Sequence, residues 1–187
     1  MLDACELTDK SGRQSCKLLR PILIAALDTG MRSGELRTLL WRVVALEERL
    51  ITIQAFITKT MKARTVSMTT RLADELAGLW EKSLKEPDLL VFGILSSVKK
   101  AFATVRRQAK IEGVRFDDLR HTAATRMVEG HLPLQEVGRV LGHTLPSTTY
   151  RYINLTTETA RRAADMLDAL NTKAEELAQV QSSGAVN

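Results

Sequence analysis

One stretch in the second half of the chain, Phe116 to Tyr152, gathers side chains that can act on a phosphodiester. It holds the adjacent pair Arg120 and His121, a Leu-Gly-His that ends at His143, and a Thr-Thr-Tyr-Arg-Tyr that ends at Tyr152. An arginine can hold a phosphate through paired hydrogen bonds, a histidine can move a proton near neutral pH, and a tyrosine can form a covalent intermediate. These residue types indicate phosphodiester chemistry only if the fold brings them together.

Three further candidates lie upstream of this stretch. Arg32, in Thr-Gly-Met-Arg-Ser-Gly-Glu-Leu, stands at the entrance of an expected helix, and Glu35 follows one turn later. Two interpretations stay open: Arg32 is solvated and pairs with Glu35, or Glu35 fixes an arginine that points into a cleft. Lys59 lies at the expected tip of a β-hairpin, where a lysine either blunts the edge of a sheet or reaches bound DNA as a proton donor.

Hydrophobic periodicity predicts the elements that must position these residues. Apolar residues at helical spacing predict helices over 18–30, from an N-cap at Ser33, over 70–82 and 96–112, from Asp117 or Asp118 to Gly130, over 133–140 and from Thr157. Alternating residues predict a β-hairpin over 50–57 and 63–68, with 43–46 as a third strand. The expected fold class is α+β and mostly helical, a helical bundle with a small antiparallel three-stranded sheet.

Composition and charge favour a polyanionic partner. The chain of 187 residues has 27 Lys and Arg against 22 Asp and Glu, a formal net charge of +5, and a pI near 9.4, which is typical of proteins that bind nucleic acid. Its 44% hydrophobic residues exclude global disorder. No apolar run approaches the roughly 20 residues that a membrane span needs. Cys5 and Cys16 have no metal-ligand spacing and indicate reduced thiols in the cytoplasm.

Four segments, in this order, resemble the catalytic domain of the tyrosine recombinases, the phage integrase family. They are TGMRSGEL, ITKTMKARTV, FDDLRHTAAT and LGHTLPSTTYRY. The likeness covers roughly residues 18–177. It implies the fold of the DNA breaking-rejoining enzymes. It also implies a site-specific recombinase or integrase that cleaves and rejoins DNA through a 3′-phosphotyrosyl intermediate, without metal, ATP or another cofactor.

The resemblance assigns a role to each candidate. Arg32 and Arg120 hold the scissile phosphate, and Tyr152 is the nucleophile that attacks it. His143 hydrogen-bonds a phosphate oxygen or assists proton movement. Lys59 is the general acid that protonates the departing 5′ oxygen.

One position departs from the family pattern. Glu35 matches the acid that supports the first arginine, but Asp117 stands where the family usually has a basic residue, three positions before the second arginine. An anion opposes a phosphate, so we expect Asp117 to act as a helix N-cap or as a proton acceptor for Tyr152, and an impaired enzyme or a relic is the alternative. His121 matches a family position with a structural role. Tyr150 is the other tyrosine that could be mistaken for the nucleophile.

The resemblance also implies a domain organisation and partners. Residues 1–16 are expected to be the end of a truncated helix and a linker, 17–180 the catalytic domain, and 181–187 a disordered tail. The family's separate amino-terminal domain is expected to be missing, so DNA binding should be weak and salt-sensitive. Double-stranded DNA is the expected partner, with a tetramer on DNA in the full-length protein. Residues 157–177 dock on a neighbouring protomer or pack in cis. The expected location is the cytoplasm, at the nucleoid of a bacterium or as a phage-encoded protein.

Two other function classes stay open. Residues 134–153 read as a helix-turn-helix DNA-binding regulator, with Thr148, Thr149 and Arg151 facing a major groove. This explains the basic charge but gives Arg32 and Lys59 no task. A metal-dependent nuclease is the third class, in which the ligands are Asp117, Asp118 and His121 on one helix.

Overall fold

The computed structural model describes residue 2 and residues 19–54, 63–93, 98–145, 147–150 and 164–168 of the chain. The chain divides into two compact units, Met1–Tyr152 and Ile153–Asn187. In the second unit the described residues, 164–168, are helical. The division into 1–16, 17–180 and 181–187 stays a prediction.

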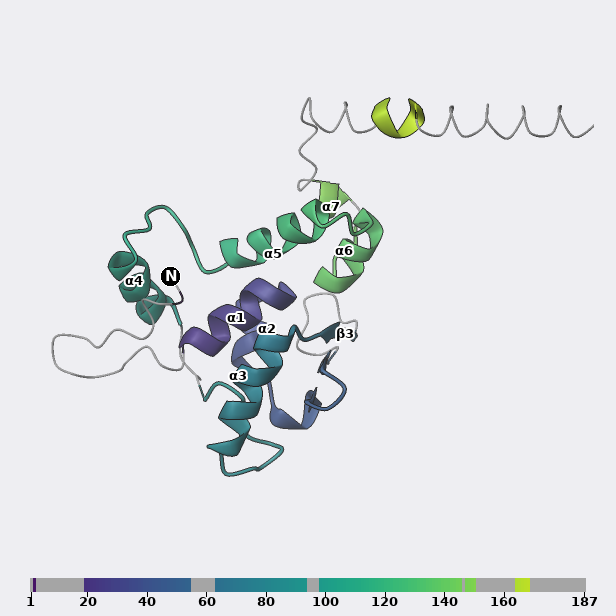
Figure 1. Cartoon of the computed structure of the whole chain (residues 1–187). Coiled ribbons are helices and arrows are strands. Elements are labelled where there is room, and N and C mark those ends of the chain that lie inside the picture. Colours follow the sequence, from purple (N-terminus) through teal and green to yellow (C-terminus); the bar gives the residue numbers. More distant parts are fainter. Residues whose placement is uncertain are drawn as a thin grey trace, which may run out of the picture. The chain divides into compact units, whose positions relative to one another are not determined.

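Helices make up most of the described part of the first unit (Figure 1). They are α1 (Leu19–Thr29), α2 (Ser33–Arg37), α3 (Thr70–Glu81), α4 (Lys99–Gln108), α5 (Asp118–Glu129), α6 (Leu134–Leu141) and α7 (Ser147–Tyr150). A 3₁₀ turn, Trp41–Val43, follows α2. The predicted fold class is confirmed, although α2 and α4 are shorter than the periodic pattern suggested.

Helix α1 is the centre of the core. Its residues from Ile22 to Ala26 are all at most 1% exposed, which is the pattern of a helix that is covered on all sides. It packs against α5 and also against α3, so that it lies between them (Figure 1). Pro21 lies in the first turn, where a missing N–H breaks no helical hydrogen bond. The loop after α1 is therefore fixed by a rigid support.

The small sheet consists of β1 (Val44–Ala45), β2 (Leu50–Ile53) and β3 (Arg64–Ser67) in the order β1-β2-β3, with antiparallel pairing. Ile51 pairs with Val66, and Ile53 pairs with Arg64. Ile51, Ile53 and Val66 are at most 2% exposed, so alternate residues face the core as a strand requires. The hairpin and its third strand are confirmed. The hairpin tip with Lys59 lies outside the described residues.

One predicted helix cap is wrong, and a second is confirmed in position only. Ser33 is the first residue of α2 and Arg32 is its N-cap, with φ −71° and ψ 152°. The reason is that the Glu35 carboxylate accepts the Arg32 backbone N–H at 2.9 Å and closes the first turn. Asp117 does occupy the N-cap of α5, but its side chain makes no capping hydrogen bond. The Asp118 carboxylate instead accepts the Arg115 backbone N–H at 2.7 Å.

Within the part of the chain that the structure describes, no helix is long and apolar enough to cross a membrane.

Candidate active site

Arg120 joins the ends of two helices. Its guanidinium donates one hydrogen bond to the Gly30 carbonyl at 2.6 Å and another to the Leu141 carbonyl at 2.7 Å. Gly30 follows the last residue of α1, and Leu141 is the last residue of α6. Carbonyl groups at helix ends lack helical partners and carry partial negative charge, so a cation is favoured there. Arg120 is thus held in one orientation from both sides.

The backbone conformation and packing at position 30 require a glycine. Its φ of +64° lies in the left-handed region, and a Cβ there would overlap Cδ2 of Leu141. Arg32 follows Gly30 by two residues, which keeps their Cα atoms within about 7 Å of each other. Because the Gly30 carbonyl accepts from Arg120, Arg32 and Arg120 lie on the same side of the molecule although 88 positions separate them in the sequence.

Arg32 is held by Glu35 and is only partly open to solvent. Its Nη1 donates to Oε1 of Glu35 at 3.2 Å. The Arg32 side chain is 26% exposed, and that of Glu35 is 1% exposed. Among the described residues, Nε and Nη2 of Arg32 have no acceptor. This geometry fits the interpretation in which Glu35 fixes an arginine whose other donors face a ligand.

The main partner of Glu35 is Arg64, which the sequence did not single out. Its Nη1 and Nη2 donate to the two carboxylate oxygens of Glu35 at 3.0 and 2.8 Å. Burial alone would raise the pKa of Glu35, but the Arg64 hydrogen bonds, the Arg32 backbone N–H and both positive charges outweigh it and lower that pKa below its usual range. Glu35 is therefore a buried carboxylate that stays ionised.

A signal for Arg64 was present in the strand pattern. Arg64, Val66 and Met68 alternate with the exposed Thr65 and Ser67, so Arg64 occupies an inward position. A cation at an inward position of a strand needs a buried anion. Reading the alternation for charges as well as for apolar residues would have paired it with an acid.

The turn that carries His143 packs directly on Arg64. Gly142 has φ +69°, and a Cβ at this residue would lie 2.9 Å from Nη1 of Arg64. His143 shares a hydrogen bond of 2.8 Å between its Nδ1 and Oγ1 of Thr149. Thr149 is 1% exposed and lies in α7. The imidazole is thus oriented by the helix that directly precedes the predicted nucleophile segment.

The predicted site residues divide into two groups. The contacts described above link Arg32, Glu35, Arg120 and His143 through a continuous set of neighbours. Lys59 and Tyr152 lie outside the described residues, and the catalytic roles of all the predicted site residues stay predictions.

Three further residues from the sequence analysis lie at or near the surface. Asp117 is exposed, and its carbonyl accepts the Arg120 backbone N–H at 3.2 Å, so it lies one turn from that arginine. His121 is also exposed. Tyr150 is 58% exposed.

Of the described residues, no three His, Cys, Asp or Glu side chains are grouped so that they could hold a metal ion, so the metal-nuclease alternative gains no support from them.

Sequence relatives agree with the resemblance seen in the four segments. Residues 1–159 match the model of the phage integrase family. The chain is 29% identical over 168 residues to the shufflon-specific DNA recombinase of Escherichia coli, which covers 89% of this chain and 41% of that protein. It is 29% identical over 154 residues to tyrosine recombinase XerA of Thermococcus kodakarensis, which covers 78% of this chain and 54% of that protein. The chain thus spans about half the length of these relatives.

Solved structures share the fold. The crystal structure of XerA recombinase has a TM-score of 0.69 at 23% identity, over 88% of this chain and 60% of that one. The catalytic domain of bacteriophage HP1 integrase has a TM-score of 0.64 at 24% identity, over 88% of this chain and 87% of that one. The Tn1549 transposon integrase, in complex with a circular intermediate DNA, has a TM-score of 0.72 at 16% identity, over 88% and 62%. With a family model that matches 159 residues and a fold shared with an integrase catalytic domain, the chain belongs to the phage integrase family.

Proposed function

We propose that this chain is the catalytic domain of a site-specific recombinase or integrase that cleaves and rejoins DNA through a 3′-phosphotyrosyl intermediate. The observation that carries the proposal is the convergence of Arg32 and Arg120 on the loop after α1, next to the turn with His143. Two fixed guanidinium groups can stabilise the charge that develops on a phosphodiester in its transition state. An isolated surface arginine has no need of such support.

The proposed reaction exchanges one phosphate ester for another. The Tyr152 hydroxyl oxygen attacks the scissile phosphorus, the bond from phosphorus to the 5′ oxygen breaks, and a phosphotyrosyl bond forms. The phenol gives up a proton, with His143 assisting, and Lys59 donates one to the leaving 5′ oxygen. Free tyrosine has a pKa of about 10, so the arginines also favour attack as phenolate. Because the number of ester bonds is unchanged, the step needs no ATP.

Double-stranded DNA is the proposed substrate. A groove of about 580 Å³ adjoins α2, α4 and the start of α5, and its lining includes Arg37, Lys99, Arg106 and Arg115. With the net charge of +5, this surface suits a phosphate backbone that continues past the scissile group. The structures of the Tn1549 integrase and of XerH recombinase that resemble this chain are complexes with DNA. Self-assembly on DNA, a tetramer in the full-length protein and a cytoplasmic, nucleoid-associated location belong to the same proposal.

A covalent-adduct assay tests this function. The 187-residue chain is incubated with a pool of nicked DNA duplexes whose central sequence is randomised, so that a cleaved strand is lost and the adduct accumulates. We expect a protein–DNA adduct that survives SDS and EDTA. It should disappear in Tyr152→Phe and persist in Tyr150→Phe, the matched control two positions away. Specific binding without an adduct would favour the helix-turn-helix regulator, and an adduct that EDTA abolishes would favour metal-dependent chemistry.

Asp117 offers a second test of the same proposal. A carboxylate one turn before Arg120 repels the phosphate that Arg120 binds. Asp117→His should therefore raise the rate of adduct formation, and Asp118→His serves as the neighbouring control. An unchanged or lower rate in Asp117→His would remove the idea that this carboxylate impairs the enzyme.

A further inference from the structure

Arg64 connects three parts of the candidate site. It lies on β3, its guanidinium forms a two-pronged pair with Glu35 of α2, and its Nε donates to the Val140 carbonyl of α6 at 2.9 Å. The side chain is only 9% exposed. A planar guanidinium is the cation whose geometry matches a carboxylate and a separate carbonyl in one plane. A lysine cannot make these contacts together.

The two arginines do not share Glu35 equally. Arg64 takes both carboxylate oxygens at 2.8 and 3.0 Å, whereas the Arg32 side chain reaches one oxygen at the longer distance of 3.2 Å. The Arg32 backbone N–H takes a further position on the carboxylate at 2.9 Å. A carboxylate offers about four acceptor positions, so these four hydrogen bonds fill it. Glu35 therefore holds the Arg32 side chain through Nη1 alone and leaves Nε and Nη2 available to a ligand.

Without Arg64, Arg32 would be the only described cation paired with a carboxylate that is 1% exposed. Attraction between opposite charges is strong where water is excluded, and an unpaired buried charge is strongly unfavourable. Arg32 would then turn its second nitrogen toward Glu35 and make its own two-pronged pair. The donors that a phosphate requires would be turned away from it.

We propose that Arg64 is a positioning residue of this site: by neutralising and filling Glu35, it keeps the free donors of Arg32 directed at the scissile phosphate. Its bond to Val140 and its packing against Gly142 also fix the His143 turn relative to Arg32. This inference rests on the proposed function, and it adds a role for a residue that does not itself touch the DNA.

The test measures single-turnover adduct formation and DNA binding separately. Arg64→Met removes the charge and both prongs and should slow adduct formation by roughly 10- to 100-fold, the usual cost of losing a group that orients a reacting one. Binding of the duplex should change by less than about threefold, because the variant affects the contact to one phosphate among the many that a duplex presents. Arg42→Met is the matched control, since Arg42 pairs with Asp88 while 46% exposed, and it should leave the rate within about twofold.

Two further variants separate positioning from folding. Arg64→Lys keeps the charge but not the planar fork, and it should remain folded by circular dichroism while slowing the reaction by about tenfold. Arg64→Met combined with Glu35→Gln removes the carboxylate that would capture Arg32, so it should be faster than Arg64→Met alone. Full activity in a folded Arg64→Lys, or a double variant no faster than Arg64→Met, overturns the proposal.

A change in the substrate gives a readout that a merely structural role would not alter. A methylphosphonate at the scissile position removes the negative charge that Arg32 is proposed to hold. The ratio of the parent rate to the Arg64→Met rate should then fall toward one. A ratio equal to that on ordinary DNA overturns the inference. If the parent chain forms no adduct at all, the proposed function fails and the inference fails with it, whereas an active parent with an equally active Arg64→Met overturns the inference alone.

Discussion

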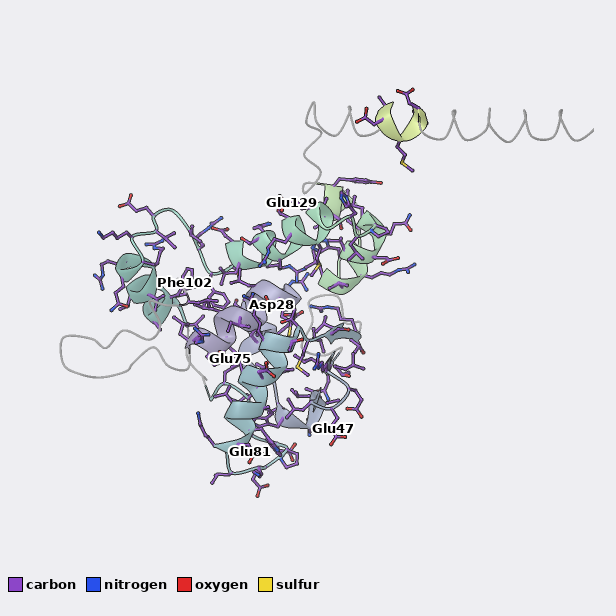
Figure 2. The ribbon with its side chains drawn as sticks, viewed as in Figure 1. Asp28, Glu47, Glu75, Glu81, Phe102 and Glu129 are labelled. Atoms are coloured by element: carbon purple, nitrogen blue, oxygen red, sulfur yellow. The ribbon has the colours of Figure 1, made fainter. Side chains whose placement is uncertain are left out.

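Two buried carboxylates, Asp28 and Glu35, lie seven positions apart in the sequence and are both paired with an arginine, but they sit in different surroundings. Asp28, near the end of α1 (Figure 2), accepts from Arg71 and, at 2.5 Å, from Thr69 at the start of α3. Arg71 is 45% exposed, whereas Arg64, the partner of Glu35, is 9% exposed. The arginine of the first pair is therefore much more open to water than the arginine of the second.

The two ion pairs also connect different structural elements. Asp28 joins α1 to the first turn of α3, and its partners belong to the scaffold only. A second ion pair, between Arg20 and Glu75, joins the same two helices, and Figure 2 shows Asp28 and Glu75 where α1 and α3 lie together. Glu35 instead joins a strand to a helix entrance, and its partner Arg64 also contacts the turn before His143. The same type of ion pair, a carboxylate with an arginine, therefore only connects two scaffold helices in the first case and forms part of the candidate site in the second.

The largest expected effect comes from removing the enclosed carboxylate. Glu35→Ala leaves Arg64 buried without its anion, and breaking a buried pair in this way costs about 3–5 kcal/mol of unfolding free energy. Urea unfolding followed by circular dichroism measures it. The control is Glu35→Gln together with Arg64→Met, which removes both charges and should recover most of the loss. A cost below about 1 kcal/mol for Glu35→Ala would mean that the pair is not sealed from water.

The corresponding change in the scaffold pair should cost less. Asp28→Ala removes the hydrogen bonds from Arg71 and Thr69, but Arg71 can turn into solvent, so we expect a loss of about 2 kcal/mol. The same urea titration measures it. Adduct formation, assayed well below the unfolding midpoint, should stay close to the parent rate, since Asp28 contacts no residue of the candidate site in the described structure. A stability loss as large as that of Glu35→Ala would erase the contrast between the two pairs.

Acidification should weaken both pairs by less than either deletion. For Asp28 as for Glu35, burial raises the pKa, but hydrogen bonds and the charge of the paired arginine outweigh it and lower the pKa below the unfolded value. A depressed carboxyl pKa stabilises the fold above the unfolded value of about 4, and that contribution is lost as pH falls through the folded value. Unfolding free energy should therefore decline below about pH 4, with a shallower slope in Glu35→Gln and in Asp28→Asn. If neither substitution changes the slope of unfolding free energy against pH, the decline is caused by other titrating groups.

The smallest effect is expected at an exposed pair. Arg42 and Asp88 meet at 2.9 Å with side chains that are 46% and 78% exposed. Such pairs contribute about 0–1 kcal/mol, so Arg42→Met should shift the urea midpoint barely beyond error. A loss comparable to that of Asp28→Ala would show that solvent exposure is not what separates these pairs.

Sequence patterns predicted the elements far better than the contacts between them. The helix over 18–30 and the alternation of β2 and β3 follow from local periodicity, and both were predicted, whereas the burial of α1 on all sides was not. The cap at Arg32 was missed because Ser33 has the higher intrinsic preference, while the hydrogen bond from Glu35 decides the outcome. The inward position of Arg64 could be predicted from the strand alternation, but its partner Glu35 could not, because it lies 29 residues away. The catalytic roles of Arg32, Arg120 and His143, like those of Lys59 and Tyr152, rest on the family resemblance and stay predictions.

Gly30 has a consequence for how members of this family are judged by sequence. A single methyl group at this position would displace Leu141 and disturb the Gly30 carbonyl, which accepts a hydrogen bond from Arg120. Arg32, two residues on, would move as well. Such a chain would still carry every side chain that is used to recognise a working recombinase. Scoring those side chains alone would therefore accept a chain whose site is disturbed, and a glycine such as this one should be scored with them.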